Sequence, residues 1–205
     1  MYESNITVAD FVNKVKGEVN AVPAFSSDAV VRIINDIQTG LYLHVIRPCR
    51  RVAVTLKTEG ELQYFTTADF ESYIGEAMPL AKDVILVCAS DKSVHFGSID
   101  QFYSLSIPVC CRMNEKIYIK NLNAASVMVH YIVTPTPITY GEVTGFVGKI
   151  CMPSGYLTLL EAGVLAELYR HMGDNDNCRR FSEKYNAMLQ EMKDHFLWLR
   201  GGDAG

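Results

Sequence analysis

Cysteine and histidine are the residues of this sequence with the widest chemical range, because they bind metals and form nucleophile–base pairs. The chain has six cysteines and five histidines: Cys49, Cys88, Cys110, Cys111, Cys151, Cys178, His44, His95, His130, His171 and His195. A cysteine hydrolase would pair Cys88 or Cys110 with His95 or His130 in space. No CxxC or HxxxH spacing supports a metal site, so we interpret the cysteines as free, mostly buried thiols. Adjacent Cys110 and Cys111 should point to opposite faces of a strand.

Glycine-rich and acidic segments offer no better chemistry. Gly141, Gly145 and Gly148 lie in "YGEVTGFVGK", which matches neither nucleotide-binding glycine pattern, so we interpret the segment as a hinge or loop. Asp174 and Asp176 in "GDND" have calcium-ligand spacing, but the loop lacks the glycine and terminal glutamate of an EF-hand, and helix capping explains both. The sequence therefore predicts no cofactor, no metal and no enzymatic activity. A Cys/His hydrolase ranks third among the alternatives.

The C-terminal segment "HFLWLR" favours contact with a partner. Phe196, Leu197, Trp198 and Leu199 are consecutive large apolar residues, which point in most directions around a helix. A lone chain should expose at least Leu197 or Trp198, and exposed apolar surface and tryptophan are typical of interfaces. The alternative is a core segment. The basic residues Arg179 and Arg180, farther upstream, either face solvent or contact an acidic partner. The predicted partner interface is Phe196, Leu197, Trp198, Leu199, Arg200, Arg179 and Arg180.

Composition limits the class of protein. The 205 residues are 49% hydrophobic and 20% charged, with a formal net charge of −4, which indicates a folded chain without a basic footprint for nucleic acid. No apolar run approaches the roughly 20 residues that span a bilayer. The N-terminus lacks the layout of a signal peptide. We therefore expect no membrane contact and synthesis in the cytosol.

Hydrophobic periodicity predicts an α+β fold with helices at both ends of the chain. A first helix is predicted after Thr7, which is its capping residue. A second is predicted from Ser26 or Ser27, and it ends at Arg47-Pro48. Helical spacing returns in a pair of helices around Gly173, the predicted cap of the first. Between them, period-two segments predict an antiparallel sheet. Its expected strands are 51–56, 62–65, 84–88, 93–96, 102–105, 109–113, 116–120 and 126–133, with a short helix at 69–77.

The order of these segments predicts a helical body with an inserted β lobe. Residues 1–49 form the N-terminal helical part, residues 50–138 the antiparallel lobe, and residues 139–205 the C-terminal helical hairpin and tail. Because neither helix pair buries its apolar face alone, we expect a four-helix unit. Pro135 and Pro137 lie where the chain leaves the lobe, and we predict that they form a stiff hinge.

Four segments in this order resemble a known family: "ITVADFV", "IINDIQTGLYLHVIRP", "KIYIKNLNAASVMVHYIVTPTPI" and "LEAGVLAELYRHMGDNDNCRRFSEKYNAML". They resemble the head-to-tail adaptor (connector or neck) proteins of tailed bacteriophages and related virion structural proteins of short-tailed phages. The likeness spans nearly the whole chain and rests on the shared order of weak motifs. The large β insertion departs from the compact helical adaptors, which leaves the subgroup open.

The resemblance implies a non-enzymatic subunit of a homo-oligomeric ring, commonly of twelve copies, on the portal protein. Such a ring extends the DNA channel, which DNA passes without sequence-specific binding, and it is the platform for tail or nozzle proteins. The implied location is the head-tail junction of the virion, after assembly in the host cytoplasm. The alternatives are a cytosolic α+β protein-binding module or another virion structural protein.

Overall fold

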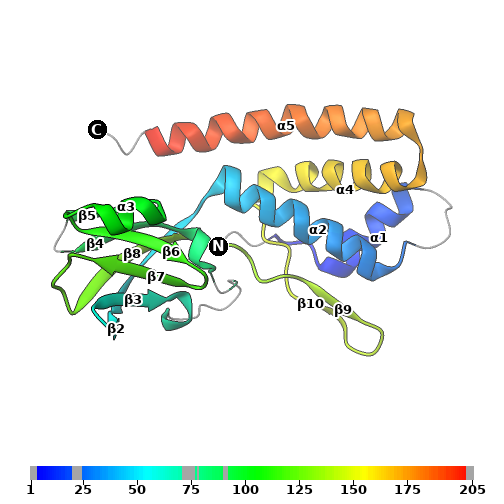
Figure 1. The fold of residues 1–205 in the computed structure, drawn as a ribbon. Coiled ribbons are helices and arrows are strands. Elements are labelled where there is room, and N and C mark those ends of the chain that lie inside the picture. Colours follow the sequence, from blue (N-terminus) through cyan, green and yellow to red (C-terminus); the bar gives the residue numbers. More distant parts are fainter. Residues whose placement is uncertain (1–3, 20–24, 71–76, 78, 90–91, 202–205) are drawn as a thin grey trace. The chain divides into compact units, whose positions relative to one another are not determined.

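The computed structural model describes residues 4–19, 25–70, 77, 79–89 and 92–201. These residues form a mixed α+β fold with five α-helices, a curled eight-stranded sheet and a separate two-stranded sheet (Figure 1). Internal contacts divide the chain into two units. The helical unit comprises Met1–Arg47 and Pro135–Gly205, and the β unit comprises Pro48–Thr134. The sequence placed these boundaries at 49/50 and 138/139.

The N-terminal helices begin at the predicted caps. Helix α1 (Val8–Glu18) starts after Thr7, whose hydroxyl oxygen accepts a hydrogen bond from the Asp10 N–H at 3.1 Å. Helix α2 (Ser27–Leu41) starts after Ser26, which caps Ala29 in the same way. Both caps satisfy N–H groups that have no partner within the helix. The two capping predictions are therefore confirmed.

Helix α2 continues into one π-helical segment, η1 (Tyr42–Ile46), before the chain leaves the helix. Arg47 then adopts a left-handed conformation with φ 47°. The residue before a proline avoids the α region, so Pro48 explains why the helix ends here. The end predicted at Arg47-Pro48 is confirmed.

The C-terminal helices form a hairpin. Helix α4 (Leu157–Met172) follows the 3₁₀ turn η4 (Ser154–Tyr156) and ends at Gly173, whose φ of 74° is left-handed. Helix α5 (Asn175–Gly201) follows after Asp174, whose carboxylate accepts the N–H of Asn177 at 3.1 Å. A glycine can adopt this φ without the steric cost of a Cβ, which explains the stop at Gly173. The predicted cap and hairpin are confirmed.

One hydrophobic core draws on α1, α2, η1, α4 and α5. Its buried side chains include Phe11, Ile34, Leu160 and Met192. One buried polar side chain of this core bonds to the backbone of a distant segment. Gln38 on α2 is 1% exposed, and its Oε1 accepts the N–H of Cys151 at 2.9 Å.

The segment "YGEVTGFVGK" (140–149), interpreted above as a hinge or loop, lies largely in a β-hairpin, and that interpretation is wrong. Strand β9 (Thr139–Gly141) pairs antiparallel with β10 (Gly145–Val147). The Tyr140 and Phe146 rings lie 4.8 Å apart and pack against the helical core. The glycines serve turn geometry, since Gly145 has φ 66°. A turn of this kind needs positive φ, which glycine supplies.

The β unit contains the eight-stranded sheet, whose order is β1-β8-β4-β5-β6-β7-β3-β2. The strands are β1 (Cys49–Thr55), β2 (Lys57–Glu59), β3 (Leu62–Thr66), β4 (Val84–Ala89), β5 (Lys92–Phe96), β6 (Val109–Met113), β7 (Lys116–Lys120) and β8 (Ser126–Ile132). The end strands β1 and β2 are separated in sequence by Leu56 alone. One extended segment thus pairs with β8 first and β3 later, which curls the sheet into a half-barrel (Figure 1).

Two predictions for this unit are corrected. Residues 102–105 are not a strand: residues 102–104 belong to helix α3 (Ile99–Ser104), which begins at a capping box formed by Ser98 and Gln101, and Leu105 is its C-cap. This short helix belongs to the crossover that carries the chain from the end of β5 back to the level where β5 began. Strands β5 and β6 therefore pair in parallel, with His95 opposite Val109. The sheet is consequently not wholly antiparallel.

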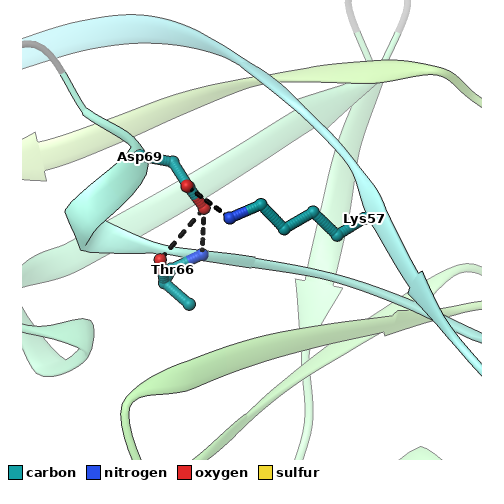
Figure 2. Close-up of polar contacts among 3 residues, drawn as sticks. All are labelled: Lys57, Thr66 and Asp69. Carbon is teal, nitrogen blue, oxygen red and sulfur yellow. Dashed lines mark hydrogen bonds and ion pairs between the residues drawn. The ribbon is translucent and has the colours of Figure 1, made fainter.

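The helix predicted at 69–77 lies largely outside the described residues. Its described beginning is one 3₁₀ turn, η2 (Thr67–Asp69), and a further 3₁₀ turn, η3 (Ala81–Asp83), precedes β4. Figure 2 shows the polar contacts that fix η2. Asp69 Oδ2 accepts the Thr66 N–H and hydroxyl, both at 3.0 Å, and Lys57 Nζ lies 2.5 Å from Asp69 Oδ1. These contacts hold the turn against the first residue of β2.

The curled sheet buries side chains on both faces. Cys110 belongs to the main core with Phe65 and Val129, whereas Cys111 packs in a second cluster with Phe102 of α3. Adjacent residues of a strand point to opposite faces, so the prediction made for this cysteine pair is confirmed.

Candidate functional site

The structure places Cys110 where it cannot act as a ready nucleophile. Its Sγ is buried and lies 3.4 Å from the main-chain oxygen of His95, not from the imidazole. In the sheet register Cys110 is paired with Phe96, while His95 is paired with Val109. Neighbouring strand positions face opposite sides, so the His95 ring and the Cys110 thiol are separated by the sheet. Burial raises the pKa of Cys110 to about 12, and the thiol stays protonated at neutral pH.

Cys88 and His130 lie on neighbouring strands and are closer in register. Cys88 pairs with Met128, and Leu86 pairs with His130, so the two side chains share one face at diagonal positions. Diagonal neighbours of this kind are about 7 to 8 Å apart between Cα atoms. None of the six cysteines forms a disulfide; Cys49 is exposed, and Cys110, Cys111 and Cys151 are buried.

Metal-ligating side chains do not gather in the described part of the chain: no three His, Cys, Asp or Glu residues there could hold one ion. Asp174 caps α5, and its carboxylate also accepts a hydrogen bond from the Asn177 side chain at 2.7 Å. Hydrogen bonds from Asn177 hold the pKa of Asp174 below its ordinary value. Its observed role is therefore that of a helix cap.

The C-terminal end of α5 is the most distinctive surface of the helical unit. Helix α5 has 27 residues and α4 has 16, which correspond to lengths of about 40 and 24 Å. The ring of Tyr156, just before α4, lies 6.4 Å from that of Phe196. Past this point α4 no longer accompanies α5. Leu197, Trp198 and Leu199 are accordingly 60%, 73% and 42% exposed.

The predicted interface residues thus separate into two groups. Phe196 is 6% exposed and belongs to the helical core, so its side chain is not available to a partner molecule. It also continues the core face of α5 after Met192. The spacing of four from Met192 to Phe196 keeps the side chain on the buried face. Arg200 lies in α5, but its side chain is outside the described residues.

The basic pair at the start of α5 has partners within its own helix. Arg179 Nε lies 2.9 Å from Glu183 Oε1, and both side chains are largely exposed. The Arg180 guanidinium lies 4.6 Å from the centre of the Phe181 ring. An exposed pair separated by four residues contributes about 0.3 to 0.5 kcal/mol. Contact of these arginines with a partner stays a prediction.

A groove in the helical unit, which sequence reasoning missed, has a volume of about 570 Å³. Its walls come from α2 with η1 and from α5, and residues of α4 complete it. Its apolar lining comprises Ile33, Ile37, Leu41, Val45 and Leu189, and its polar lining Asp36, His44, Glu167, His171, Tyr185 and Lys193. A volume of this size is typical of binding sites.

One sequence signal pointed to this groove. Ile33 and Ile37 widen the apolar stripe of α2 beyond what its core requires, and both remain half-buried. Gly40 lies one turn farther, next to the last residue of α2 and before η1, where a Cβ would meet no atom within 4 Å. Glycine costs a helix about 1 kcal/mol relative to alanine, and no neighbour in the described chain requires it here.

No protein-family model matches this sequence, and no curated protein aligns with it significantly. Among the described residues, no helix combines the length and apolar composition needed to cross a bilayer.

Proposed function

We propose that this chain is a virion structural protein: a head-to-tail adaptor subunit that assembles as a ring on the portal of a tailed phage. In this role the ring extends the DNA channel and provides the attachment platform for tail or nozzle proteins. The chain acts through binding and carries no catalytic site. It is made in the host cytoplasm and ends at the head-tail junction.

The observation that carries the proposal is the uncovered apolar end of α5. Trp198 is 73% exposed and Leu197 is 60% exposed. Both lie at the end of α5, which is longer than its neighbour α4. Water contact with such a surface is unfavourable, and large aromatic side chains are enriched where protein partners bind. A subunit of a larger assembly would cover this apolar surface with a partner, whereas a monomeric enzyme has no need of it.

The division of the chain is consistent with an adaptor. The helical unit is assembled from both ends of the chain, and the β unit is inserted between Arg47 and Pro135. We propose that the helices form the body of the subunit and that the β unit is a lobe with its own contact surface. Pro135 and Pro137 are the proposed hinge between the two.

The charge of the chain suits a channel that DNA traverses. The formal net charge is −4, so the protein has no excess of cations to neutralise phosphates and bind DNA tightly. DNA can therefore pass such a ring without being held.

Mass measurement of the purified chain, alone and mixed with the portal protein of the same phage genome, tests the proposal. We expect a complex of defined stoichiometry with the portal, visible as an added ring in negative-stain images. Some adaptors assemble only on the portal, so a free monomer is compatible with the proposal. A stable monomer that binds neither itself, the portal nor a tail protein would refute it and favour a cytosolic binding module.

A further inference from the structure

Strand β1 is a long, open edge of the eight-stranded sheet. The sheet order places β1 at one end and β2 at the other. Strand β2 has three residues, whereas β1 has seven and contains no proline. Proteins commonly prevent another chain from pairing with a sheet edge by keeping the edge strand short or by placing a proline in it. Strand β1 has neither protection.

The main-chain groups of β1 alternate between two sides. Just before the strand, the Pro48 carbonyl accepts the N–H of Val133 at 2.9 Å, and just after it the Leu56 N–H donates to the Ala125 carbonyl at 2.9 Å. Alternate residues of a strand bond to the same side. The even-numbered residues of β1 therefore bond to β8, and the odd-numbered residues direct their N–H and C=O groups away from it.

Three odd-numbered residues of β1, Arg51, Ala53 and Thr55, thus present an unpaired main-chain edge. No hydrogen bond joins these groups to another residue that the structure describes on that side of the strand. Their side chains are exposed as well. Such N–H and C=O pairs recur about every 7 Å along the edge, and an extended polypeptide presents complementary groups at the same repeat.

We propose that this edge of β1 binds an acidic, extended segment of a partner protein, which adds to the sheet as a further strand. The inference goes beyond the proposed function, because it assigns a surface and a mode of binding to the β unit. It does not depend on the adaptor role, since a partner of any other origin would bind the edge in the same way.

The charge of the edge indicates an acidic partner segment. Arg51 is exposed and forms no ion pair with another described residue. Neither β1 nor its neighbour β8 contains an aspartate or a glutamate. A residue opposite Arg51 in an added strand would lie about 5 Å from it between Cβ atoms, where an opposite charge stabilises the pair.

A second copy of this chain fits the edge less well than a separate segment does. Lys57 lies two residues after Thr55 and pairs with Tyr64 of β3. Residues of the same parity point to the same side, so β3 occupies the free side of the chain from Lys57 onward. Two β1 edges that met antiparallel would bring β3 of each copy against the other. A separate extended segment meets no such obstruction.

Amide hydrogen exchange in the free, full chain tests whether the edge is open. We expect the N–H groups of Arg51, Ala53 and Thr55 to exchange at least about 100-fold faster than those of Val52 and Val54, which bond to β8. NMR of the isotope-labelled chain resolves the individual amides. Equal protection of the two sets would mean that the edge is already covered, and it would overturn the inference.

Strand addition is then measured with a blocked synthetic peptide as long as β1. Threonine alternates with valine in this peptide, and glutamate replaces the central valine. Two controls carry N-methyl groups, either on the valines and the glutamate or on the internal threonines. With the glutamate opposite Arg51, only the first set removes donors that face β1. We expect the first control to bind at least about tenfold more weakly than the second, and the bound parent peptide to slow exchange at Ala53.

Ala53→Pro and Ala53→Val form the matched pair of protein variants. Proline removes an N–H that points away from β8, so it blocks the free side without breaking the existing ladder, whereas valine keeps that N–H. We expect Ala53→Val to bind the peptide as the wild type does, and Ala53→Pro to bind at least about tenfold more weakly. Circular dichroism checks the fold of both variants. If Ala53→Pro does not fold, the two methylated peptides on the wild type decide.

Several results overturn the inference. They are equal binding of the two methylated peptides, equal binding by two folded Ala53 variants, and no binding of the parent peptide at millimolar concentration. Protection of the same amides by self-association, without peptide, would make a second copy the occupant and would also overturn it. No portal protein enters these measurements, so the proposed function is tested separately by its own experiment.

Discussion

Phe196 and Trp198 provide the sharpest prediction, because they are two residues apart on one helix and have opposite environments. Phe196 is 6% exposed in the helical core, and Trp198 is 73% exposed. We expect Phe196→Ala to lower the free energy of unfolding, because α5 loses a packing contact with the core. Trp198→Ala should instead weaken assembly while the chain stays folded.

The magnitudes follow from the exposed fractions. Removing a buried phenylalanine costs about 3 to 5 kcal/mol of stability, through lost burial and the cavity left behind. A tryptophan presents up to about 250 Å², so the 73% exposed at Trp198 leaves about 180 Å² for a partner. At about 25 cal/mol per Å², this sets a ceiling of about 4.5 kcal/mol. Part of that energy is lost in ordering the interface, so we expect about 2 to 4 kcal/mol, or about 30- to 900-fold weaker association.

The folding cost of Trp198→Ala should be small. The covered part of the side chain, about 70 Å², is worth at most about 1.7 kcal/mol, and alanine returns a fraction of this as the better helix former. Urea unfolding followed by circular dichroism measures stability for both variants. Sedimentation velocity, with and without the portal, measures association.

Two results would refute this reasoning. Equal loss of stability in Trp198→Ala and Phe196→Ala would show that Trp198 is a core residue. Unchanged assembly of a fully folded Trp198→Ala variant would show that the end of α5 is not an interface.

The remaining predictions concern the local structure. Gly173 has φ 74°, so Gly173→Ala should destabilise the chain by about 1 kcal/mol. Gly17 lies in ordinary helix, and Gly17→Ala should stabilise the chain by up to about 1 kcal/mol. Thermal unfolding measures both changes, and a change of the same sign in the two variants would contradict the role of Gly173 as a cap. Gln38→Met should cost about 1 to 3 kcal/mol, because the Cys151 N–H loses its acceptor in the core; full stability in urea would mean that another group accepts this bond. Partial burial raises the pKa of Asp69, but hydrogen bonds and charge from Lys57 and hydrogen bonds from Thr66 outweigh it, and the pKa lies below its ordinary value. The contribution of Asp69 is therefore present above the unfolded pKa of about 3.9 and is lost as pH falls through the lowered folded pKa. Asp69→Asn should be about 1 kcal/mol less stable at pH 7 and should approach the wild type in acid; a difference that is independent of pH would exclude this origin.

Local signals in the sequence located most elements. Thr7 and Ser26 cap the helices that they were predicted to cap, and Gly173 ends α4. These features depend on a few neighbouring residues, since a cap needs only a side-chain oxygen and a nearby N–H. The exposure of Leu197 and Trp198 was also predictable, because consecutive apolar residues cannot all face one side of a helix.

Where local signals competed, the sequence misled. "SIDQFYSL" contains β-branched and aromatic residues, which favoured a strand at 102–105, but the box formed by Ser98 and Gln101 initiates a helix. That single element decides whether β6 returns antiparallel or parallel to β5. In "YGEVTGFVG" three glycines obscured a hairpin whose strands are held by the Tyr140–Phe146 pair.

Local features of the chain were enough to predict the helix caps, the strand period, the opposite faces of Cys110 and Cys111, and the exposure of Trp198. The caps follow from side-chain oxygens beside helix N–H groups, and the rest from the fixed periods of helix and strand. Long-range packing, by contrast, placed Phe196 in the core, made β1 and β2 the two end strands of one curled sheet, and left a groove between α2 and α5. These features depend on which distant segments pack together and on how far α5 extends past α4, and periodicity within one segment contains no information about either.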